Sequence, residues 1–376
     1  MSVTYTVQIT DPYGVPVGPI VTTDGTIGDP NALAALSYSR VTNDTGVAVL
    51  RYAGELSARL LRLDNLVLIY RSINGVTTLV TDTAWMIRSW RFTLDGSGQR
   101  STEIIAYSGN YLLSSRGVAY QTRSAQSTKS GAADNLIKEV VRENLGSSAT
   151  DTARTIAGIS VQADTGQGQS IDVVVGWRNS VLTVAQELAD ASTDAGTYIA
   201  FDLVTTTPGQ WEFRTFANQR GVDRRVPGGT LPLLLGTDYG NLADVEYVAD
   251  YSDLGTAAYA LGDGAGSRRR VQTATNDPAI ALSPYNRREV YVEANNATTA
   301  NQVLRAARSA LRRQRARVTM QGRIVETPST RYGIDWQWGD YVTATAFGVT
   351  LNARIDAISV SIESGRETVD AWVRSD

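Results

Sequence analysis

The chain has 376 residues, of which 42% are hydrophobic and 19% charged, and its formal net charge is −3; these values fit a folded protein of two or three domains and argue against a general nucleic-acid binder. It contains no Cys and no His, which excludes disulfides, thiolate nucleophiles, Ser-His-Asp triads and metals held by Cys or His. No apolar run reaches the roughly 18 residues of a membrane span, and the N-terminus lacks the features of a signal peptide, so we expect a protein made in a cytosol, with no membrane segment.

Alternating apolar and polar residues predict a first β-barrel in residues 1–115. The expected strands begin with one strand and a hairpin, and continue as a meander with a hairpin turn at Asn74-Gly75. They cover residues 4–9, 36–42, 47–52 and 63–108. The stretch 110–120 then leaves this barrel, with Leu112 and Leu113 as its anchors.

The middle of the chain, residues 116–239, has the pattern of an inserted α/β domain. A polar linker over 121–132 is followed by a helix that we expect to begin at Asp134 and end at Gly146. A second helix begins at Asn179 or Ser180 and stops at Gly196. The remaining elements are a short strand and a hairpin, at residues 171–175, 198–204 and 211–216.

Residues 240–376 predict a second β-barrel that contains one helix, over residues 299–315. Thr299 and Gln302 have the spacing of a capping box. An apolar stripe should pack this helix on its own barrel, and an arginine row forms the opposite face. The stripe contains Val303, Leu304, Ala307, Ala310 and Leu311, and the arginine row contains Arg305, Arg308, Arg312 and Arg315.

The final meander, residues 338–375, repeats the pattern of residues 63–108. Gly348-Val349-Thr350 corresponds to Gly75-Val76-Thr77, and Asp340 corresponds to Asp64. The apolar parity of the long strand slips by one at Ala357-Ile358, which indicates a β-bulge of the kind that curves sheets. Two copies so far apart predict two similar barrels in one subunit. The fold class is thus α+β and mainly β, with two tube-like β-barrel domains flanking an inserted α/β domain.

No motif in the chain predicts a chemical site, so we expect no catalytic, cofactor-binding or metal-binding residue. Gly262, Gly264 and Gly266 lack the spacing and the following helix of a dinucleotide-binding loop, and a hairpin tip is the better interpretation. Residues 24–29 lack the spaced ligands of a calcium loop. Lys129 lacks the preceding serine of a Ser-x-x-Lys motif. The arginine row fits a solvated helix face or a row of salt bridges between subunits better than a DNA contact.

The chain resembles the tail-tip hub proteins of tailed phages with long non-contractile tails, which are related in fold to the central baseplate hub of contractile tails. The similarity covers nearly the whole length. Its clearest part begins at Gly240-Asn241-Leu242 and ends at Gly262-Asp263-Gly264. This part includes Val245, Tyr247 and Asp250-Tyr251-Ser252. Further matching stretches are residues 37–43, the meander 63–108, Tyr111-Leu112-Leu113, residues 134–146 and Gly339-Asp340-Tyr341-Val342.

The resemblance implies a structural virion protein that assembles in the host cytoplasm. Its role would be a homotrimeric hub at the distal end of the tail, which adapts the sixfold tail tube to a threefold tip. Expected partners are further copies of itself, distal tail and tail tube proteins, tip or fibre proteins and the tape-measure protein, while duplex DNA passes through the channel without specific binding. We expect no cofactor and no enzymatic activity, in particular no hydrolase activity.

Two other functions are compatible with parts of the sequence. A cell-wall hydrolase of the carboxylate type would need two carboxyl groups that face each other across a cleft. A carbohydrate-binding β-module would need a row of exposed aromatic residues, but most tryptophans are expected within strands. These are Trp85, Trp90, Trp336, Trp338 and Trp372.

Overall fold

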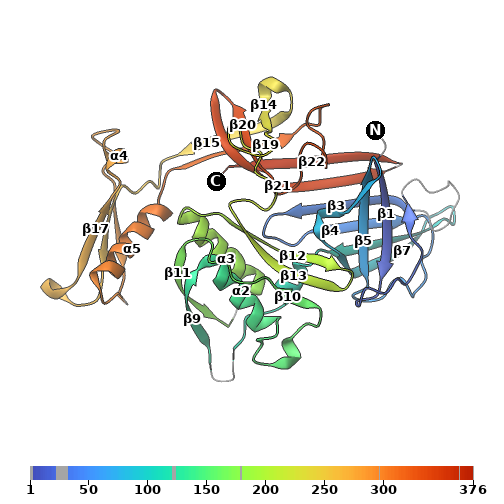
Figure 1. The fold of residues 1–376 in the computed structure, drawn as a ribbon, viewed down its shortest axis with the longest axis horizontal. Helices are drawn as coiled ribbons and strands as arrows, with labels where there is room; N and C mark the ends of the chain where they lie inside the picture. Colours follow the sequence, from blue (N-terminus) through green and yellow to red (C-terminus); the bar gives the residue numbers. More distant parts are fainter. Residues whose placement is uncertain are drawn as a thin grey trace.

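The computed structural model describes residues 3–22, 33–120, 124–177, 180–295, 297–363 and 365–375. The fold is mainly β, as the sequence predicts. Figure 1 shows a large curled sheet with helices below it and a smaller module at one end. No helix in the described ranges is long and apolar enough to cross a membrane.

The central sheet has 14 strands in the described residues. Its first half consists of β1 (Val3–Thr10), β2 (Val21–Thr22), β3 (Leu33–Val41), β4 (Val47–Tyr52), β5 (Leu66–Ile73), β6 (Val76–Leu79), β7 (Trp85–Leu94) and β8 (Arg100–Tyr107). Its second half consists of β14 (Leu234–Gly236), β15 (Leu242–Asp250), β19 (Arg317–Ile324), β20 (Tyr341–Ala346), β21 (Val349–Glu363) and β22 (Arg366–Arg374). A short 3₁₀ helix, η1 (Val80–Asp82), separates β6 from β7, where the apolar pattern of residues 78–94 predicts one long strand.

The two halves of the sheet have the same strand pairing. In the first half the neighbours are β3-β4-β8-β7-β5, and in the second half they are β15-β19-β22-β21-β20, with every pair antiparallel. Both β5 and β20 lead into a tight turn whose two central residues have positive φ, Asn74-Gly75 and Phe347-Gly348. The predicted internal repeat is therefore confirmed at the level of strand pairing.

Backbone hydrogen bonds shift the predicted alignment of the two halves by one residue. The Ile87 amide donates to the carbonyl of Asn65 at 2.8 Å, and the Ile355 amide donates to the carbonyl of Asp340 at 2.9 Å. Asp340 therefore corresponds to Asn65 and not to Asp64. The predicted bulge also lies slightly earlier, because the register of β21 shifts between Ile355 and Ala357, as that of β7 does between Ile87 and Ser89.

The two halves join in one sheet, so the prediction of two separate barrels is not confirmed. β21 extends past its own half and pairs antiparallel with β3, from Ala357 opposite Val41 to Glu363 opposite Ala35 (Figure 1). A single hydrophobic core then contains side chains of both halves. Two meanders can be read from alternation, but their pairing with each other depends on contacts more than 300 residues apart in the sequence, such as Thr42 with Asp356.

The middle region packs two helices against small sheets below the central sheet (Figure 1). Its elements are α1 (Tyr111–Ser114), β9 (Gln126–Ala132), α2 (Ala133–Asn144), η2 (Thr152–Arg154), β10 (Ile159–Val161), β11 (Ser170–Gly176), α3 (Val181–Asp194), β12 (Ile199–Thr207), β13 (Gln210–Ala217) and η3 (Thr237–Tyr239). Ser180 caps α3, and Gly196 follows it with a φ of +100°, as predicted; Asn179 lies outside the described residues.

Two predictions for the middle region are wrong. Most of the expected linker is β9, which pairs with β11 along its whole length. Asp134 does not cap α2, because the cap position is Ala132 and Asp134 lies inside the first turn. Its carboxylate is fully buried and accepts hydrogen bonds from Thr165 at 2.7 Å and Lys138 at 3.2 Å. In the sequence, an aspartate near the start of a helix looks the same whether it caps the helix or is buried within its first turn.

A separate module projects from the second half of the sheet, seen at the left of Figure 1. It contains β16 (Ala257–Leu261), η4 (Gly266–Arg268), β17 (Val271–Thr275), α4 (Asp277–Ile280), β18 (Glu289–Glu293) and α5 (Ala300–Arg313). The capping box of Thr299 and Gln302 is confirmed. The predicted packing of this helix on a barrel is wrong: Val303 and Ala307 pack on Ala258 and Ala260 of β16. These small alanines let the helix lie close to the three-stranded sheet.

Candidate functional site

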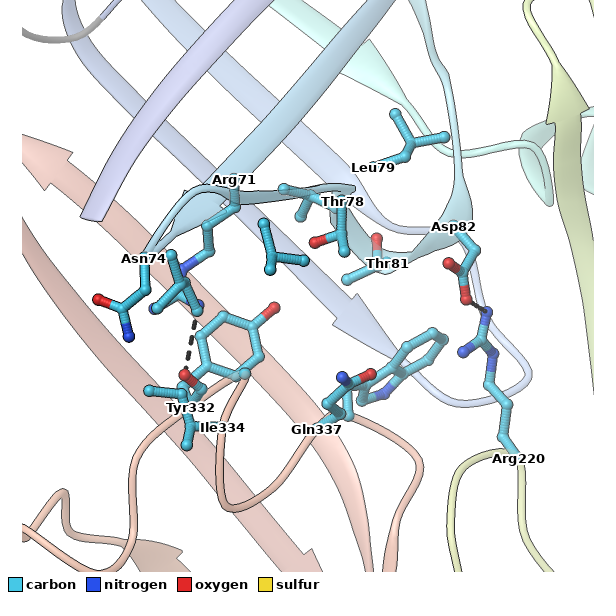
Figure 2. A pocket seen from close by; sticks show the side chains of 15 residues that line it. Arg71, Asn74, Thr78, Leu79, Thr81, Asp82, Arg220, Tyr332, Ile334 and Gln337 are labelled. Carbon is cyan, nitrogen blue, oxygen red and sulfur yellow. Dashed lines mark hydrogen bonds and ion pairs between the residues drawn. The ribbon is translucent and has the colours of Figure 1, made fainter. Parts of the chain in front are cut away.

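A cavity of about 410 Å³ lies between the two halves of the central sheet. One wall is formed by the end of β5, by β6 and by η1, and the opposite wall by residues 332–338, which lead from β19 to β20. Figure 2 shows Asn74, Thr78 and Asp82 on one side and Tyr332 and Gln337 on the other. The lining is mixed, because hydroxyl, amide and charged groups surround aromatic rings.

Arg71 fixes one end of this cavity. Its Nε and Nη2 donate to the two carboxylate oxygens of Glu367, each at 3.0 Å, and its Nη1 donates to the carbonyl of Tyr332 at 3.3 Å. A Cβ at Gly333 would lie 2.4 Å from Arg71 Nη1, so the close approach requires glycine, as does its φ of +75°. These contacts link β5 and β22 to the segment between β19 and β20.

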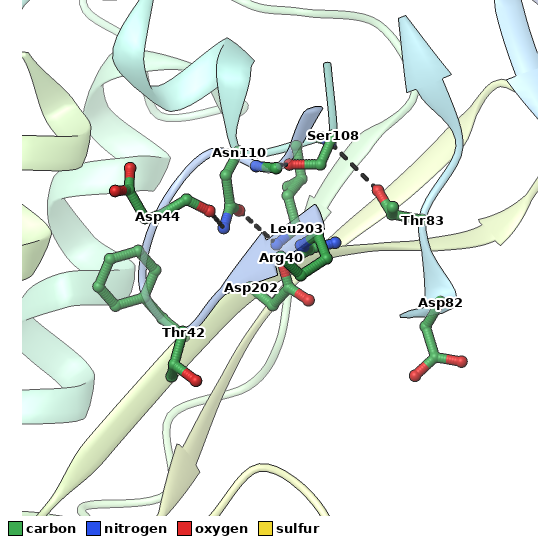
Figure 3. Close-up of polar contacts among 12 residues, drawn as sticks. Arg40, Thr42, Asp44, Asp82, Thr83, Ser108, Asn110, Asp202 and Leu203 are labelled. Carbon is green, nitrogen blue, oxygen red and sulfur yellow. Dashed lines mark hydrogen bonds and ion pairs between the residues drawn. The ribbon is translucent and has the colours of Figure 1, made fainter. Parts of the chain in front are cut away.

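The other end of the cavity adjoins an ion-pair network, which we call the joint (Arg40, Asp82, Asp202, Arg220 and Trp338) and of which only Asp82 is largely exposed. Arg40 lies on β3, and its Nη2 donates to Asp202 on β12 at 2.6 Å, with both side chains fully buried (Figure 3). Arg220 donates to the second oxygen of Asp202 at 2.8 Å and reaches Asp82 at 3.4 Å. The joint thus connects the first half of the sheet to the middle region.

The indole ring of Trp338 contacts the guanidinium groups of both arginines of the joint. The guanidinium carbon of Arg40 is 4.6 Å from the ring centre, and that of Arg220 is 4.3 Å from it. Aromatic faces attract cations, most strongly where water is excluded. Nε and Nη1 of Arg40 have no hydrogen-bond partner among the described residues, so the ring face and the single carboxylate stabilise its charge. A Cβ at Gly46 would lie 2.3 Å from Arg40 Cδ, which explains a glycine there.

Two asparagines of the first half form hydrogen bonds with the backbone groups along the outer edge of β12. The side chain of Asn43 donates to the carbonyl of Ile199 at 3.1 Å and accepts from the amide of Phe201 at 2.7 Å. Asn110 accepts from the amide of Leu203 at 2.9 Å (Figure 3). Because an unpaired buried backbone group is destabilising, these side chains replace a neighbouring strand and hold the middle region on the sheet.

Asp340 holds the segment that returns from the middle region to the second half. Its carboxylate accepts from the Val222 amide at 2.7 Å, from Arg224 Nε at 2.6 Å and from the Gln337 amide at 2.9 Å. The side chain is almost fully buried. The aspartate that the sequence singles out before the last meander is therefore a structural residue.

The joint makes the stability of the folded chain depend on pH in the acid range. Burial opposes ionisation of Asp202, but Arg40 and Arg220 outweigh it and lower the pKa of this carboxyl below its usual value. A lowered folded-state pKa stabilises the protein above the unfolded-state value of about 3.9, and this stability is lost as the pH falls through the folded value. We expect Asp202→Asn to be less stable than the native chain in urea at pH 7, and the gap to narrow below about pH 4. A gap independent of pH would contradict this assignment.

A second depression, a groove of about 630 Å³, lies between the ends of α3 and α5 and the strand β21. Its charged lining consists of Arg313, Arg315, Arg317, Arg354, Arg374, Asp190, Asp194 and Asp356. Burial and the neighbouring Asp194 raise the pKa of Asp190. Asp190 and Asp194 lie one turn apart on α3, so these two carboxylates do not face each other across the groove, as the hydrolase alternative would require; the third carboxylate of the lining, that of Asp356, lies on β21.

The structure places the other residues that the sequence singles out at separate positions. Gly262, Gly264 and Gly266 lie in the connection between β16 and β17, which confirms a hairpin tip. Arg305, Arg308 and Arg312 are exposed. Residues 24–29 lie outside the described residues. In the described ranges, no group of three or more acidic side chains is arranged to hold a metal ion.

The last member of the arginine row, Arg315, has a partner within the chain. It forms an exposed ion pair with Asp194 on α3 at 3.1 Å.

The tryptophans also divide into two groups. Trp85, Trp336 and Trp338 are buried, and the last two lie in the loop before β20 and not in a strand, whereas Trp90 and Trp372 are about two-fifths exposed.

Sequence reasoning missed the joint altogether. Arg40 lies in an alternating stretch and Arg220 in a polar segment after β13, and in both settings a charged residue predicts a solvent-facing position. The only available signal was Asp202 within the otherwise apolar run 199–204, in which one charged residue is unusual.

Comparison with solved structures assigns the fold to a class. Across 99% of this chain and 94% of the other, the fold matches the prophage tail protein gp18 from Listeria monocytogenes EGD-e, with a TM-score of 0.55 and 12% identity. A 43 kDa tail protein of prophage MuSo2 from Shewanella oneidensis matches over 98% and 97% of the chains, with a TM-score of 0.53 and 12% identity. A tail protein from Neisseria meningitidis MC58 matches over 99% and 97%, again with a TM-score of 0.53 and 12% identity. The chain has the fold of phage tail proteins.

The family follows from the sequence itself. Residues 28–373 match the model of the Siphovirus ReqiPepy6 Gp37-like proteins, and the chain belongs to this tail protein family. The resemblance to proteins of tailed phages is thereby confirmed. No curated protein matches the chain.

Proposed function

We propose that the chain is the homotrimeric hub at the distal end of a phage tail, where it adapts a sixfold tail tube to a threefold tip. The observation that carries this proposal is the repeated strand pairing, β3-β4-β8-β7-β5 and β15-β19-β22-β21-β20. Three chains with two equivalent halves present six similar units to a sixfold ring. The middle region and the projecting module occur once per chain, so they present threefold symmetry.

For this role we assign residues 1–115 and residues 240–376 to two tube-like units, and residues 116–239 to an insert between them. Residues of the joint, above all Arg40 and Asp202, hold the insert in one orientation through a fully buried ion pair. A fixed orientation suits a part that holds the tip in a defined position relative to the tube. Tail tube, tip or fibre and tape-measure proteins are the proposed partners, and duplex DNA would pass through the channel.

The proposal assigns no catalysis to the chain. A hub acts through surfaces, and the mixed cavity beside the joint has Asp82 as its only lining carboxylate in the described residues. Asp82 already contacts Arg220 at 3.4 Å. The hydrolase alternative, which needs two facing carboxyl groups, therefore has less support in this cavity than the structural role.

The proposed role predicts the number of copies in a virion. Quantitative mass spectrometry of purified particles, calibrated with labelled peptides of this chain and of the tube protein, should give three copies of this chain per tail. Antibody labelling should place them at the end of the tail distant from the capsid. Six copies per tail, or label along the tube, would contradict the proposal.

A further inference from the structure

The outer part of β7 has an uncovered edge with an apolar stripe. β7 pairs with β8 along its length, but it pairs with β5 only through Trp85 and Met86. From Ser89 to Leu94, its second edge has no neighbouring strand in the described part of the chain. Three apolar side chains alternate there, with exposed fractions of 38% for Trp90, 50% for Phe92 and 65% for Leu94.

This stripe lies on the core face of the sheet. Trp90 is directly opposite Ile104 of β8, and Phe92 is opposite Thr102. Directly opposite residues point to the same face, and both Ile104 and Thr102 are fully buried. The core face of the sheet therefore continues into the stripe but is uncovered there.

The second half of the sheet shows how the same face is covered. Aligning the two bulges makes Trp90, Phe92 and Leu94 equivalent to Ile358, Val360 and Ile362 of β21. All three β21 residues are buried. At these positions β21 pairs with β3, which completes the core.

The strand of the second half that corresponds to β3 is β15, and one edge of β15 can still pair with another strand. In the repeat β3 is the neighbour of β4, and β15 is the neighbour of β19. β15 is the last strand of the sheet, so its other edge has no strand partner in the described residues. We propose that β15 of a second copy of this chain pairs antiparallel with residues 89–94 of β7.

The internal junction also fixes the register of this contact. Ser359 pairs with Ser39 and Val360 with Tyr38 in the β21–β3 junction. Ser39 and Glu246 occupy the same place opposite β4 and β19, so the equivalent pair across two chains is Arg91 with Glu246. Phe92 then lies opposite Val245, which lies in the irregularity of β15 between Ala243 and Glu246. Trp90 would face Tyr247, from the pairing of Ile358 with Arg40.

The side chains fit this register. Arg91 is 68% exposed and joined only to Glu103 in the described residues, so it can also reach an exposed carboxylate from a neighbour. Val245 and Tyr247 are partly buried and pack at the margin of the core. An apolar stripe thus meets apolar side chains on the inner face, and opposite charges meet on the outer face.

The contact is head to tail, because the two edges differ and each chain carries one of each. Such contacts close into a ring when the rotation permits. The ring of three chains rests on the proposed function. The pairing of the two edges does not, because it follows from the repeat.

Paired cysteines test this contact without background, because the chain has no Cys. Two single variants, Arg91→Cys and Glu246→Cys, are co-expressed and oxidised; we expect a disulfide-linked dimer that reduction removes. Either variant alone should give at least tenfold less dimer, since two like edges do not meet. The combination of Arg91→Cys with Tyr247→Cys controls for register, because Tyr247 points to the opposite face. Phe92→Cys with Val245→Cys provides a second matched pair.

The internal junction supplies a positive control. Ser39→Cys combined with Ser359→Cys in one chain should form an intrachain disulfide and leave the mass unchanged. A trimer in which neither matched interchain pair forms a disulfide would overturn the edge contact and leave the hub proposal standing. A protein that stays monomeric at every concentration, without interchain disulfides, would overturn both.

Discussion

Replacing Asp202 with Ala should destabilise the folded chain by about 3 to 5 kcal/mol, the usual effect of removing one partner of a buried ion pair. The expected effect is large because two cations, Arg40 and Arg220, share this carboxylate. Arg40 would remain fully buried with only the face of Trp338 against it. Urea unfolding followed by circular dichroism measures the change at pH 7.

An exposed ion pair gives the matched control for this variant. Arg51 contacts Glu103 at 2.8 Å, and its side chain is 61% exposed. Arg51→Ala should change the free energy of unfolding by less than about 1 kcal/mol, because water screens surface pairs. Equal effects of Asp202→Ala and Arg51→Ala would show that the joint is not an important source of stability.

Replacing Val360 with Asp should prevent folding of the central sheet, whereas Phe92→Asp at the equivalent position should not. Val360 is fully buried where β21 pairs with β3. An unpaired carboxylate there loses its hydration without a partner and destabilises by more than about 4 kcal/mol. Phe92 is half exposed in the single subunit, so its carboxylate variant keeps water.

The two variants are compared by circular dichroism and by mass in solution. Val360→Asp should lose the native thermal transition. Phe92→Asp should keep a melting temperature within a few degrees of the native chain, and should lose at least tenfold in the association constant. Unfolding of the Phe92→Asp subunit would contradict an uncovered stripe on β7, because Phe92 would then contribute to the core of its own chain, as Val360 does.

Local patterns predicted much of the fold. Alternation in the last meander predicted β20, β21 and β22, and a shift of parity indicated the bulge near Asp356. The capping box at Thr299 fixed the start of α5, because its hydrogen bonds are formed within four residues. These features depend on neighbours in the sequence, and neighbours are visible in a single chain.

Contacts between distant segments could not be predicted in the same way. Pairing of β21 with β3 requires a strand from each half, and nothing in either strand specifies the other. The packing surface of α5 was also ambiguous, since its apolar stripe fits any small apolar sheet. Charged residues of the joint were read as surface positions, because only the folded chain brings Arg40, Asp202 and Arg220 together. The candidate site was therefore the least predictable part.

The most direct test of the central claim is the mass of the purified chain in solution, combined with the symmetry of the particle in electron micrographs. We expect a mass of three times 40.5 kDa, and axial views with six similar densities around a channel and three projecting ones. A sixfold mass, a closed dimer, or a threefold ring without six similar inner densities would contradict the claim that two equivalent halves of each chain build the ring.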